Sequence, residues 1–378
     1  MILPSDRYAL QLISLVTAAG DLELSLAPVA IPSPGPDEVV IRIEAAPINP
    51  SDLILLLAGV DPRTLTTSGP ADRPVVRGKL RSVERLAARV GVPMAVGNEG
   101  AGTVIEAGAS PEAQALRDKV VAVATGSGMY AQYRVVRAAQ CLPLGDGARA
   151  IDGASAVINP QTALGFLETM RRQGHRALAN TAAASNLGQM LIRLCVADGI
   201  PLVNVVRRAE QVAALRAIGA THVCVSSSPT FTAELTDAFA ETGATIAFDA
   251  VGGGALPGQL LACMEAAINR SATTYSRYGS FTHKQVYIYG ALDHSPTVLD
   301  RSYGLAWGIG GWLMTPVFAS LEPARVAALR ARIAAELTTT FASPHAATVS
   351  LAGALDLAAI TKYAAQASGA KTLILPNG

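Results

Sequence analysis

The sequence predicts an α/β fold in which a doubly wound parallel sheet is inserted into a β-rich domain. Short β-branched runs without helical periodicity occupy the first 148 residues, helices and strands alternate over 149–316, and short strands return at 347–350 and 371–375. A length of 378 residues leaves room for two domains. We therefore expect a β-rich domain at 1–148 and 317–378 and a parallel-sheet domain at 149–316.

The first domain carries a helix start directly after one of its predicted strands. A β-branched run at 39–43 leads into the segment PINPSD, which ends at Asp52. Pro50 fits a first helical turn, and Ser51 and Asp52 favour one, so a helix is expected from Asn49 onward. Further strands are expected at 120–124 and 130–136, and the glycines of GNEGAGTVIEAG (97–108) predict a tightly turned strand.

The second domain centres on residues 176–208, which read as a strand, a tight turn, a helix and a second strand. The apolar run 177–181 precedes a turn of small residues, and the helix that follows has apolar residues at helical spacing up to Asp198-Gly199. A second run spans 202–206. A unit this short is expected to be a right-handed βαβ crossover.

That unit predicts a dinucleotide site. Free N–H groups at a helix start bind anions, and small residues let a pyrophosphate approach the backbone. The expected contacts are Ala183, Ala184, Ser185, Asn186, Leu187 and Gly188. Arg207 and Arg208 end the second strand, where an acidic residue would bind a ribose 2′-hydroxyl, and a guanidinium suits a 2′-phosphate. We therefore expect NADP(H).

The glycine fingerprint of such sites is incomplete. Of G-x-G-x-x-G only Gly188 remains, and Ala182 and Ser185 stand where glycines are expected. Ala182 is small enough for a slightly wider turn, and Ser185 or Asn186 could cap the helix. The alternative interpretation is an ordinary α/β turn with surface arginines at a strand end.

The remaining strands of the parallel sheet are expected at 222–226, 245–250 and 285–289. Ligands of such sheets bind beyond the carboxyl ends of the strands, which adds Val251, Gly252, Gly290, Ala291 and Leu292 to the expected cofactor contacts.

The apolar run 311–318, which contains Trp312, is predicted to be an edge strand. It favours a homodimer that pairs this edge across a two-fold axis. The alternative is that Trp312 packs beneath the chain's own helices and the protein is a monomer.

Composition narrows the possible partners. Charged residues make up 16% of the chain and the formal net charge is +1, so neither nucleic acid nor a strongly acidic partner is expected. The four cysteines are widely scattered, which argues against a zinc or redox site. No run approaches the ~20 apolar residues of a membrane helix, and the N-terminus lacks signal-peptide features. We expect a cytoplasmic protein that acts on a small molecule.

With these motifs in order, the chain resembles the medium-chain dehydrogenase/reductase superfamily. The resemblance implies a GroES-like β-rich domain and a Rossmann domain, and its motifs add Thr162 and Lys371 to the expected cofactor contacts. It rests on PINPSD (47–52), GNEGAGTVIEAG (97–108), INPQTAL (158–164), AAASNLG (182–188), FDAVGG (248–253) and GAKTLIL (369–375).

Within the superfamily, the chain is similar to the zinc-independent quinone reductases and the 2-enoyl thioester reductases. Zinc-dependent members would carry Cys at the NPSD motif and His at Asn98, so no metal site is expected. The resemblance implies hydride transfer from NADPH to an electrophilic small molecule, a quinone or an α,β-unsaturated carbonyl. Alternatives are 2-enoyl thioester reduction and a non-catalytic NADP(H)-binding sensor.

Two residues are candidates for catalysis. Asn49 would help hold the nicotinamide or polarise a carbonyl, and solvent or Tyr130 would deliver the proton. The structural alternatives are a helix-start residue for Asn49 and a partly buried strand residue for Tyr130. In enoyl reductases of this type, a tyrosine that acts as the acid follows the NPSD helix, where this chain has Gly59-Val60-Asp61.

Overall fold

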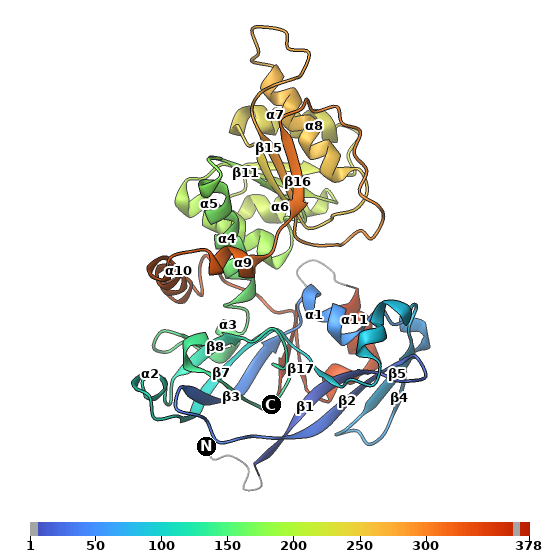
Figure 1. The fold of residues 1–378 in the computed structure, drawn as a ribbon, viewed down its shortest axis with the longest axis vertical. Coiled ribbons are helices and arrows are strands. Elements are labelled where there is room, and N and C mark those ends of the chain that lie inside the picture. The colour runs from blue at the N-terminus through green and yellow to red at the C-terminus, as the bar shows by residue number, and fades with distance from the viewer. Residues whose placement is uncertain (1–6, 366–370) are drawn as a thin grey trace. The chain divides into compact units, whose positions relative to one another are not determined.

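A computed structural model describes residues 7–365 and 371–378. The chain divides into two compact units, Met1–Ile158 with Arg330–Gly378, and Asn159–Leu329. Figure 1 shows by colour how the last residues of the chain rejoin the unit that the first residues build. Gly369 and Ala370 of the C-terminal motif lie outside the described residues.

The first unit is the β-rich GroES-like domain. Its described strands form two sheets, in the orders β4-β5-β2-β1-β6 and β10-β8-β7-β3-β18-β17, and β9 also pairs with β3. Alternate residues of β2 are buried, as expected for a strand with one face on the core. The strands are β1 (Tyr8–Val16), β2 (Asp21–Ala30), β3 (Glu38–Pro47), β4 (Thr66–Ser68), β5 (Val75–Lys79), β6 (Met94–Ala95), β7 (Glu99–Ala107), β8 (Val120–Ala124), β9 (Tyr133–Arg137), β10 (Leu142–Pro143), β17 (Ala347–Ser350) and β18 (Thr372–Leu375).

Short helices join these strands. The most important for the site is α1 (Pro50–Leu56), which begins directly after β3. The others are α2 (Pro111–Gln114), α3 (Ala150–Gly153), α11 (Leu357–Ala364) and the 3-10 helices η1 (Pro62–Thr64), η2 (Glu84–Arg89), η3 (Ala138–Gln140) and η4 (Gly353–Leu355). β18 pairs antiparallel with β3, which brings Leu373 opposite Pro47. The C-terminal tail therefore completes the sheet that positions α1.

The second unit is a Rossmann domain. Its described strands form one parallel sheet in the order β13-β12-β11-β14-β15-β16. The chain adds strands on one side of β11 up to β13 and then on the other side from β14, so the strand order reverses between β11 and β14. The strands are β11 (Leu178–Asn180), β12 (Leu202–Val206), β13 (His222–Val225), β14 (Ile246–Asp249), β15 (Lys284–Ile288) and β16 (Trp307–Gly311). β12 is buried along its full length, as expected for a central parallel strand.

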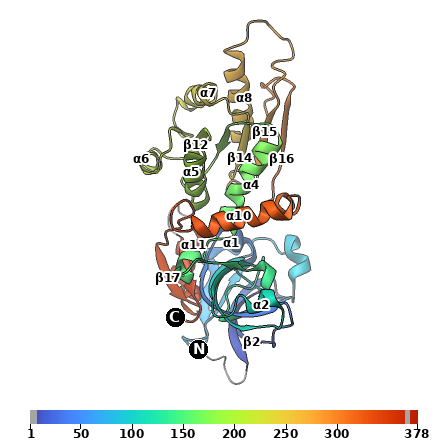
Figure 2. The same ribbon diagram turned by 90° about the vertical axis from the view of Figure 1, so that its left-hand side faces the viewer.

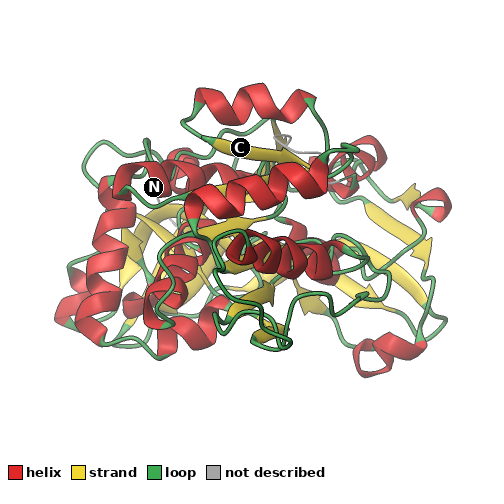
Figure 3. Ribbon diagram, turned by 90° about the horizontal axis from the view of Figure 1, so that it is seen from above, coloured by secondary structure: helices red, strands yellow, loops and turns green. Residues whose placement is uncertain are grey.

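Helices connect the parallel strands, and Figure 3 shows helices and strands by colour. They are α4 (Ile158–Arg172), α5 (Asn186–Asp198), α6 (Glu210–Ala217), α7 (Phe231–Thr242), α8 (Leu256–Asn269), α9 (Met314–Ala319) and α10 (Pro323–Ala335). The unit boundaries fall inside α4 and α10, after Ile158 and Leu329. They lie beyond the expected boundaries at 148 and 316. At the first of these, the added residues include α3, which packs against β3, β7 and β8 of the first unit. Among the described helices, none is long and apolar enough to cross a bilayer.

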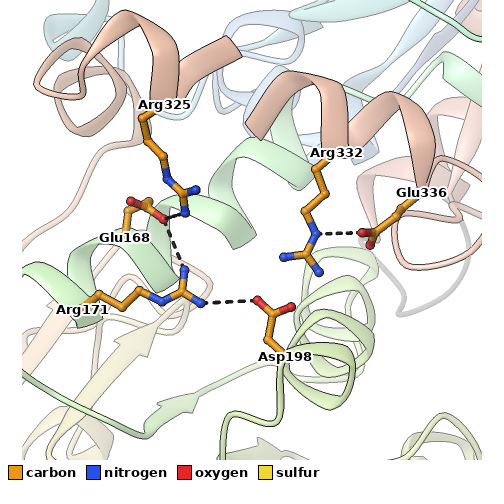
Figure 4. A network of polar contacts seen from close by, with 6 residues as sticks. All are labelled: Glu168, Arg171, Asp198, Arg325, Arg332 and Glu336. Carbon is orange, nitrogen blue, oxygen red and sulfur yellow. Dashed lines mark hydrogen bonds and ion pairs between the residues drawn. The ribbon is translucent and has the colours of Figure 1, made fainter. Parts of the chain in front are cut away.

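A polar network holds α4 within the second unit (Figure 4). Glu168 accepts from Arg171 at 3.3 Å and from Arg325 of α10 at 2.5 Å, and Arg171 also pairs with Asp198 at 3.4 Å. About one turn of α4, from Glu168 to Arg171, is thereby tied to the end of α5 and the start of α10.

The prediction of an edge strand at 311–318 is wrong. The strand at the edge of the described sheet, β16, ends at Gly311, and Met314–Ala319 is a helix that accommodates Pro316 near its start. Trp312 instead packs on Phe166 with ring centroids 4.7 Å apart, and its Nε1 donates to Thr169 Oγ1 at 3.0 Å. The apolar run favours a strand locally, whereas the Trp312 side chain packs against Phe166 and Thr169 of α4.

Candidate functional site

The turn after β11 forms the expected helix start (Figure 1). Ala183 is buried and its N–H donates to Val205 O of β12 at 3.1 Å. Ser185 precedes α5 as its N-cap, and its Oγ accepts from Gly188 N at 3.1 Å. Ala184 O accepts from the side chain of Gln189 at 3.1 Å. The start of α5, with Asn186 and Leu187 in its first turn, therefore lies at the carboxyl edge of the sheet, where a diphosphate would be bound.

The incomplete glycine fingerprint has a physical explanation. Ala182 has φ +50°, a left-handed conformation that favours glycine, so the first fingerprint position keeps its backbone geometry without the residue. At Gly188 a Cβ would lie 2.3 Å from Ala183 O, so glycine is required there. The turn retains the close approach of helix to strand that the fingerprint provides.

The two arginines after β12 differ in their contacts. Both are exposed. Arg208 Nε pairs with Glu210 at 2.8 Å, and its backbone N–H donates to Gln211 at 3.0 Å. Arg207 makes no ion pair or side-chain hydrogen bond with any residue of 7–365 or 371–378. Arg207 is therefore the unpaired cation of the described structure at this strand end.

A buried carboxylate that the sequence analysis did not single out organises the loop after β14. Asp249 is fully buried, and its Oδ1 accepts from Thr181 Oγ1 at 2.6 Å and from Val251 N at 3.0 Å, while Oδ2 accepts from Gly252 N at 2.8 Å. Thr181 Oγ1 in turn accepts from Ala250 N at 2.8 Å. An Asp at the end of an apolar strand, followed by glycines, was the available signal.

The hydrogen bonds of Asp249 hold Val251 and Gly252 of the loop in place and determine which of their N–H groups could bind a ligand. The N–H groups of Val251 and Gly252 are occupied by Asp249, so these residues shape the loop and do not act as free donors. A Cβ on Gly252 would lie 2.7 Å from Gly290 O, which shows how closely the β14 and β15 loops approach. Ala291 and Leu292 follow and are exposed, and Leu292 N donates to Ala250 O at 3.1 Å.

In the first unit, Asn49 lies between β3 and α1 and is 3% exposed. Its Nδ2 donates to Glu99 Oε1 at 2.9 Å. Glu99 is fully buried, and its Oε2 accepts from the backbone N–H groups of Val157 at 3.1 Å and Ile158 at 2.8 Å. Because a carboxylate accepts, the amide orientation of Asn49 is set, and its Oδ1 is a buried acceptor without a partner in the described structure.

Asp52, one turn further along, caps α1. Its Oδ2 accepts from Asn49 N and its Oδ1 from Asn98 N, both at 2.8 Å. Burial raises the pKa of the Asp52 carboxyl to about 6, while these two N–H groups and the Tyr130 hydroxyl oppose the shift.

Tyr130 is fully buried in the apolar core, and its hydroxyl donates to Pro47 O at 3.0 Å. Burial holds its pKa well above the usual range. Tyr130 therefore lies between the apolar core and the Asp52 carboxyl, and its hydroxyl proton is directed to Pro47 O.

Lys371 and Thr162, the two cofactor contacts expected from the family motifs, belong to the first and the second unit respectively. Lys371 Nζ donates to Ser155 Oγ at 2.8 Å, and burial lowers the pKa of Lys371 while Glu99 and Asp52 oppose that shift. Thr162 is buried on α4.

Over the described ranges, no group of three or more His, Cys, Asp or Glu side chains is placed to hold a metal ion. The amides of Asn49 and Asn98 beside Asp52 are poor zinc ligands.

Comparisons with known proteins agree with this architecture. Residues 35–146 match the alcohol dehydrogenase GroES-like domain family. The mitochondrial enoyl-[acyl-carrier-protein] reductase of Xenopus tropicalis is 31% identical over 214 residues, 53% of this chain and 51% of that protein. The corresponding protein of Caenorhabditis elegans is 26% identical over 206 residues, 53% of this chain and 52% of that one. The chain spans about half the length of the curated relatives it matches.

Solved structures match over the whole chain. A Mesorhizobium loti protein provisionally assigned as an NADPH:quinone reductase is 27% identical, with all of both chains covered and a TM-score of 0.73. The complex of Etr1p with NADP and crotonyl-CoA is 17% identical, with 99% of this chain and all of that one covered and a TM-score of 0.67, which shows the shared fold.

A GroES-like domain interrupted by a Rossmann domain defines one class of oxidoreductases, and this chain has that architecture. The chain has the fold of the medium-chain dehydrogenase/reductase superfamily, and the proteins it matches include enoyl reductases and quinone reductases.

Proposed function

We propose that the protein is an NADPH-dependent oxidoreductase that reduces a quinone or an α,β-unsaturated carbonyl compound without zinc. The observation that carries this proposal is Arg207, an exposed cation with no partner in the described structure, at the carboxyl end of a central Rossmann strand. NADPH, when bound, supplies a hydride to an electron-poor carbon, and the protein supplies binding and orientation.

The second unit has the groups that the adenosine half of NADP(H) requires. The capped start of α5 provides backbone N–H groups and a partial positive charge for the diphosphate. The contact between Gly188 and Ala183 keeps that helix start close to the strand end. Arg207 is left to bind the 2′-phosphate, while Arg208 remains with Glu210.

Asn49 is suited to hold a donor. The Nδ2 group of Asn49 already donates to Glu99. Its Oδ1, which has no partner in the described structure, can accept from an N–H or O–H of a ligand. A nicotinamide carboxamide offers such an N–H. We therefore assign Asn49 to holding the nicotinamide and not to polarising a substrate carbonyl.

The proton that completes the reduction is assigned to solvent. Tyr130 already donates to Pro47 O from within the core. Where the resemblance to enoyl reductases calls for a tyrosine, Gly59 has φ +74° and Val60 is buried. Neither position offers a hydroxyl.

A second candidate is 2-enoyl thioester reduction, which the match to the Xenopus tropicalis enoyl-[acyl-carrier-protein] reductase favours. The loss of absorbance at 340 nm, followed with a quinone panel, simple enones and crotonyl thioesters, distinguishes the candidates. Turnover of quinones or enones well above thioesters supports the proposal, and the reverse order supports thioester reduction. Tight NADPH binding without turnover of any of these compounds would contradict both and favour a sensor.

A further inference from the structure

The second unit contains a cavity at the edge of its sheet opposite the dinucleotide turn. Its volume is about 370 Å³, within the range of small-ligand pockets. Leu202 and His222, the first residues of β12 and β13, line it together with the residues that follow α5. The helices and strand around it, α5, α7 and β12, are labelled in Figure 2. It is therefore separate from Arg207 and the start of α5, which lie at the carboxyl edge.

One side of the cavity is apolar. The largest buried apolar side chains in its lining come from α5 and the start of β12. Val196, also of α5, is 56% exposed. These apolar lining residues are Ile192, Cys195, Val196, Ile200, Leu202 and Ala220. Such a surface suits the hydrocarbon part of a ligand.

The polar part of the lining contains a buried acceptor that nothing satisfies. Asn204 is 1% exposed, and its Nδ2 donates to Leu202 O at 3.4 Å and to His222 O at 3.2 Å. Two carbonyl acceptors set the orientation of the amide, so its Oδ1 is the atom left without a partner in the described structure. Leaving a buried acceptor unpaired is unfavourable, and a ligand N–H would remove that cost.

The electrostatic surroundings favour a positive charge. The cavity is lined by Gly199, which ends α5, and by Glu241 and Thr242, which end α7. Helix C-termini carry partial negative charge. Glu241 adds a carboxylate, whose Oε2 lies 3.4 Å from His222 Nδ1. These groups add acceptors and negative charge at the polar end of the cavity.

We propose that this cavity binds a small amphipathic amine, with the hydrocarbon part against the α5 side and the ammonium donating to Asn204 Oδ1 near Glu241. The amine acts as a second ligand and not as the hydride acceptor. The proposal does not depend on the proposed oxidoreductase function, because none of the cavity residues belongs to the dinucleotide turn.

Titration calorimetry of the full chain tests this with three matched probes: phenethylamine, the neutral 2-phenylethanol and the anionic phenylacetate. We expect one phenethylamine per chain, with the other two probes at least about tenfold weaker, because a charge-assisted hydrogen bond contributes that much to affinity. Saturating NADPH should leave the phenethylamine affinity within about twofold. A failure of NADPH to bind would contradict the proposed function and leave this prediction testable.

Two variants locate the site. Asn204→Leu removes the acceptor at similar volume and should weaken phenethylamine about tenfold or more. Val196→Trp should fill the cavity at an exposed position and abolish binding, while Val92→Trp, a change at an exposed valine of the first unit, should not. Absence of phenethylamine binding at millimolar concentration would overturn the proposal. Binding that survives Val196→Trp, or equal affinity for 2-phenylethanol, would overturn it as well.

Discussion

At the residue scale, the two arginines after β12 have different roles because only Arg208 has an acidic partner. We predict that Arg207→Ala weakens NADPH binding by about tenfold to a hundredfold, since charge-assisted hydrogen bonds to the 2′-phosphate are lost. NADH binding should not change. Arg208→Ala is the matched control and should have a smaller effect. Calorimetric titration of both cofactors measures this, and equal affinity of the unmutated protein for NADPH and NADH would contradict the assignment.

Ala182 and Gly188 test the turn itself. Because Ala182 is left-handed, Ala182→Gly should raise the free energy of unfolding by up to about 1 kcal/mol, the steric gain less the larger entropy of the unfolded chain. Gly188→Ala should destabilise the protein strongly, because its Cβ would meet Ala183 O. Gly145→Ala, where a Cβ meets no atom within 4 Å, is the control. Urea denaturation gives all three values, and a destabilising Ala182→Gly would show that the turn does not favour glycine.

Asp52 should make stability depend on pH. Its folded-state pKa of about 6 lies above the ordinary value of 3.8, so the folded state binds more protons between these values. The free energy of unfolding should therefore fall as pH rises from about 4 to about 6, by of order 3 kcal/mol, and level off above.

Denaturant titrations at pH 4 and pH 7 measure this contribution. In Asp52→Asn the fall between the two pH values should be smaller by that amount. The exposed Asp72→Asn should behave like the unmutated protein. An identical pH dependence for Asp52→Asn would mean that the carboxyl ionises normally.

At the scale of elements, β16 ends the described sheet and has only β15 as a partner there. A free strand edge is normally covered or paired, so we still predict a homodimer, now paired through β16 in place of the run 311–318. Leu313, just beyond this strand, is 65% exposed and would be buried in such an interface. Trp312 would not contribute, because it packs on Phe166.

Sedimentation equilibrium at micromolar concentration should give twice the chain mass of 38.9 kDa. Leu313→Asp should return the single-chain mass by placing an unpaired charge in the interface. Val92→Asp, at another exposed apolar residue, should remain a dimer. A monomer at the outset would rule out pairing through β16.

At the scale of the whole molecule, the proposed reduction by NADPH requires no metal ion in either unit. Dialysis against a chelator should leave both the melting temperature and the NADPH-dependent activity unchanged, and a zinc-dependent alcohol dehydrogenase treated in parallel should lose activity. Elemental analysis provides the independent measurement. Stoichiometric zinc in the dialysed protein would show that ligands other than the Asn49 and Asn98 amides had been overlooked.

The local pattern of the chain was sufficient for the elements whose residues interact mainly with near neighbours in sequence. The βαβ unit of 176–208 could be predicted because apolar periodicity and a small-residue turn determine strand, helix and strand together. The return of the tail to the first domain followed from two short β-branched runs, and β17 and β18 form there.

Other properties of this protein were decided only by its tertiary structure, because they depend on residues far apart in sequence. The local pattern of the run at 311–318 favours a strand, but Trp312 packs on Phe166 and donates to Thr169, both on α4. The free acceptor of Asn49 exists because Glu99 binds the other half of the amide. In the same way, the bonds of Asp249 to Thr181 and of Asn204 to His222 join neighbouring strands, and apolar periodicity does not predict such pairs.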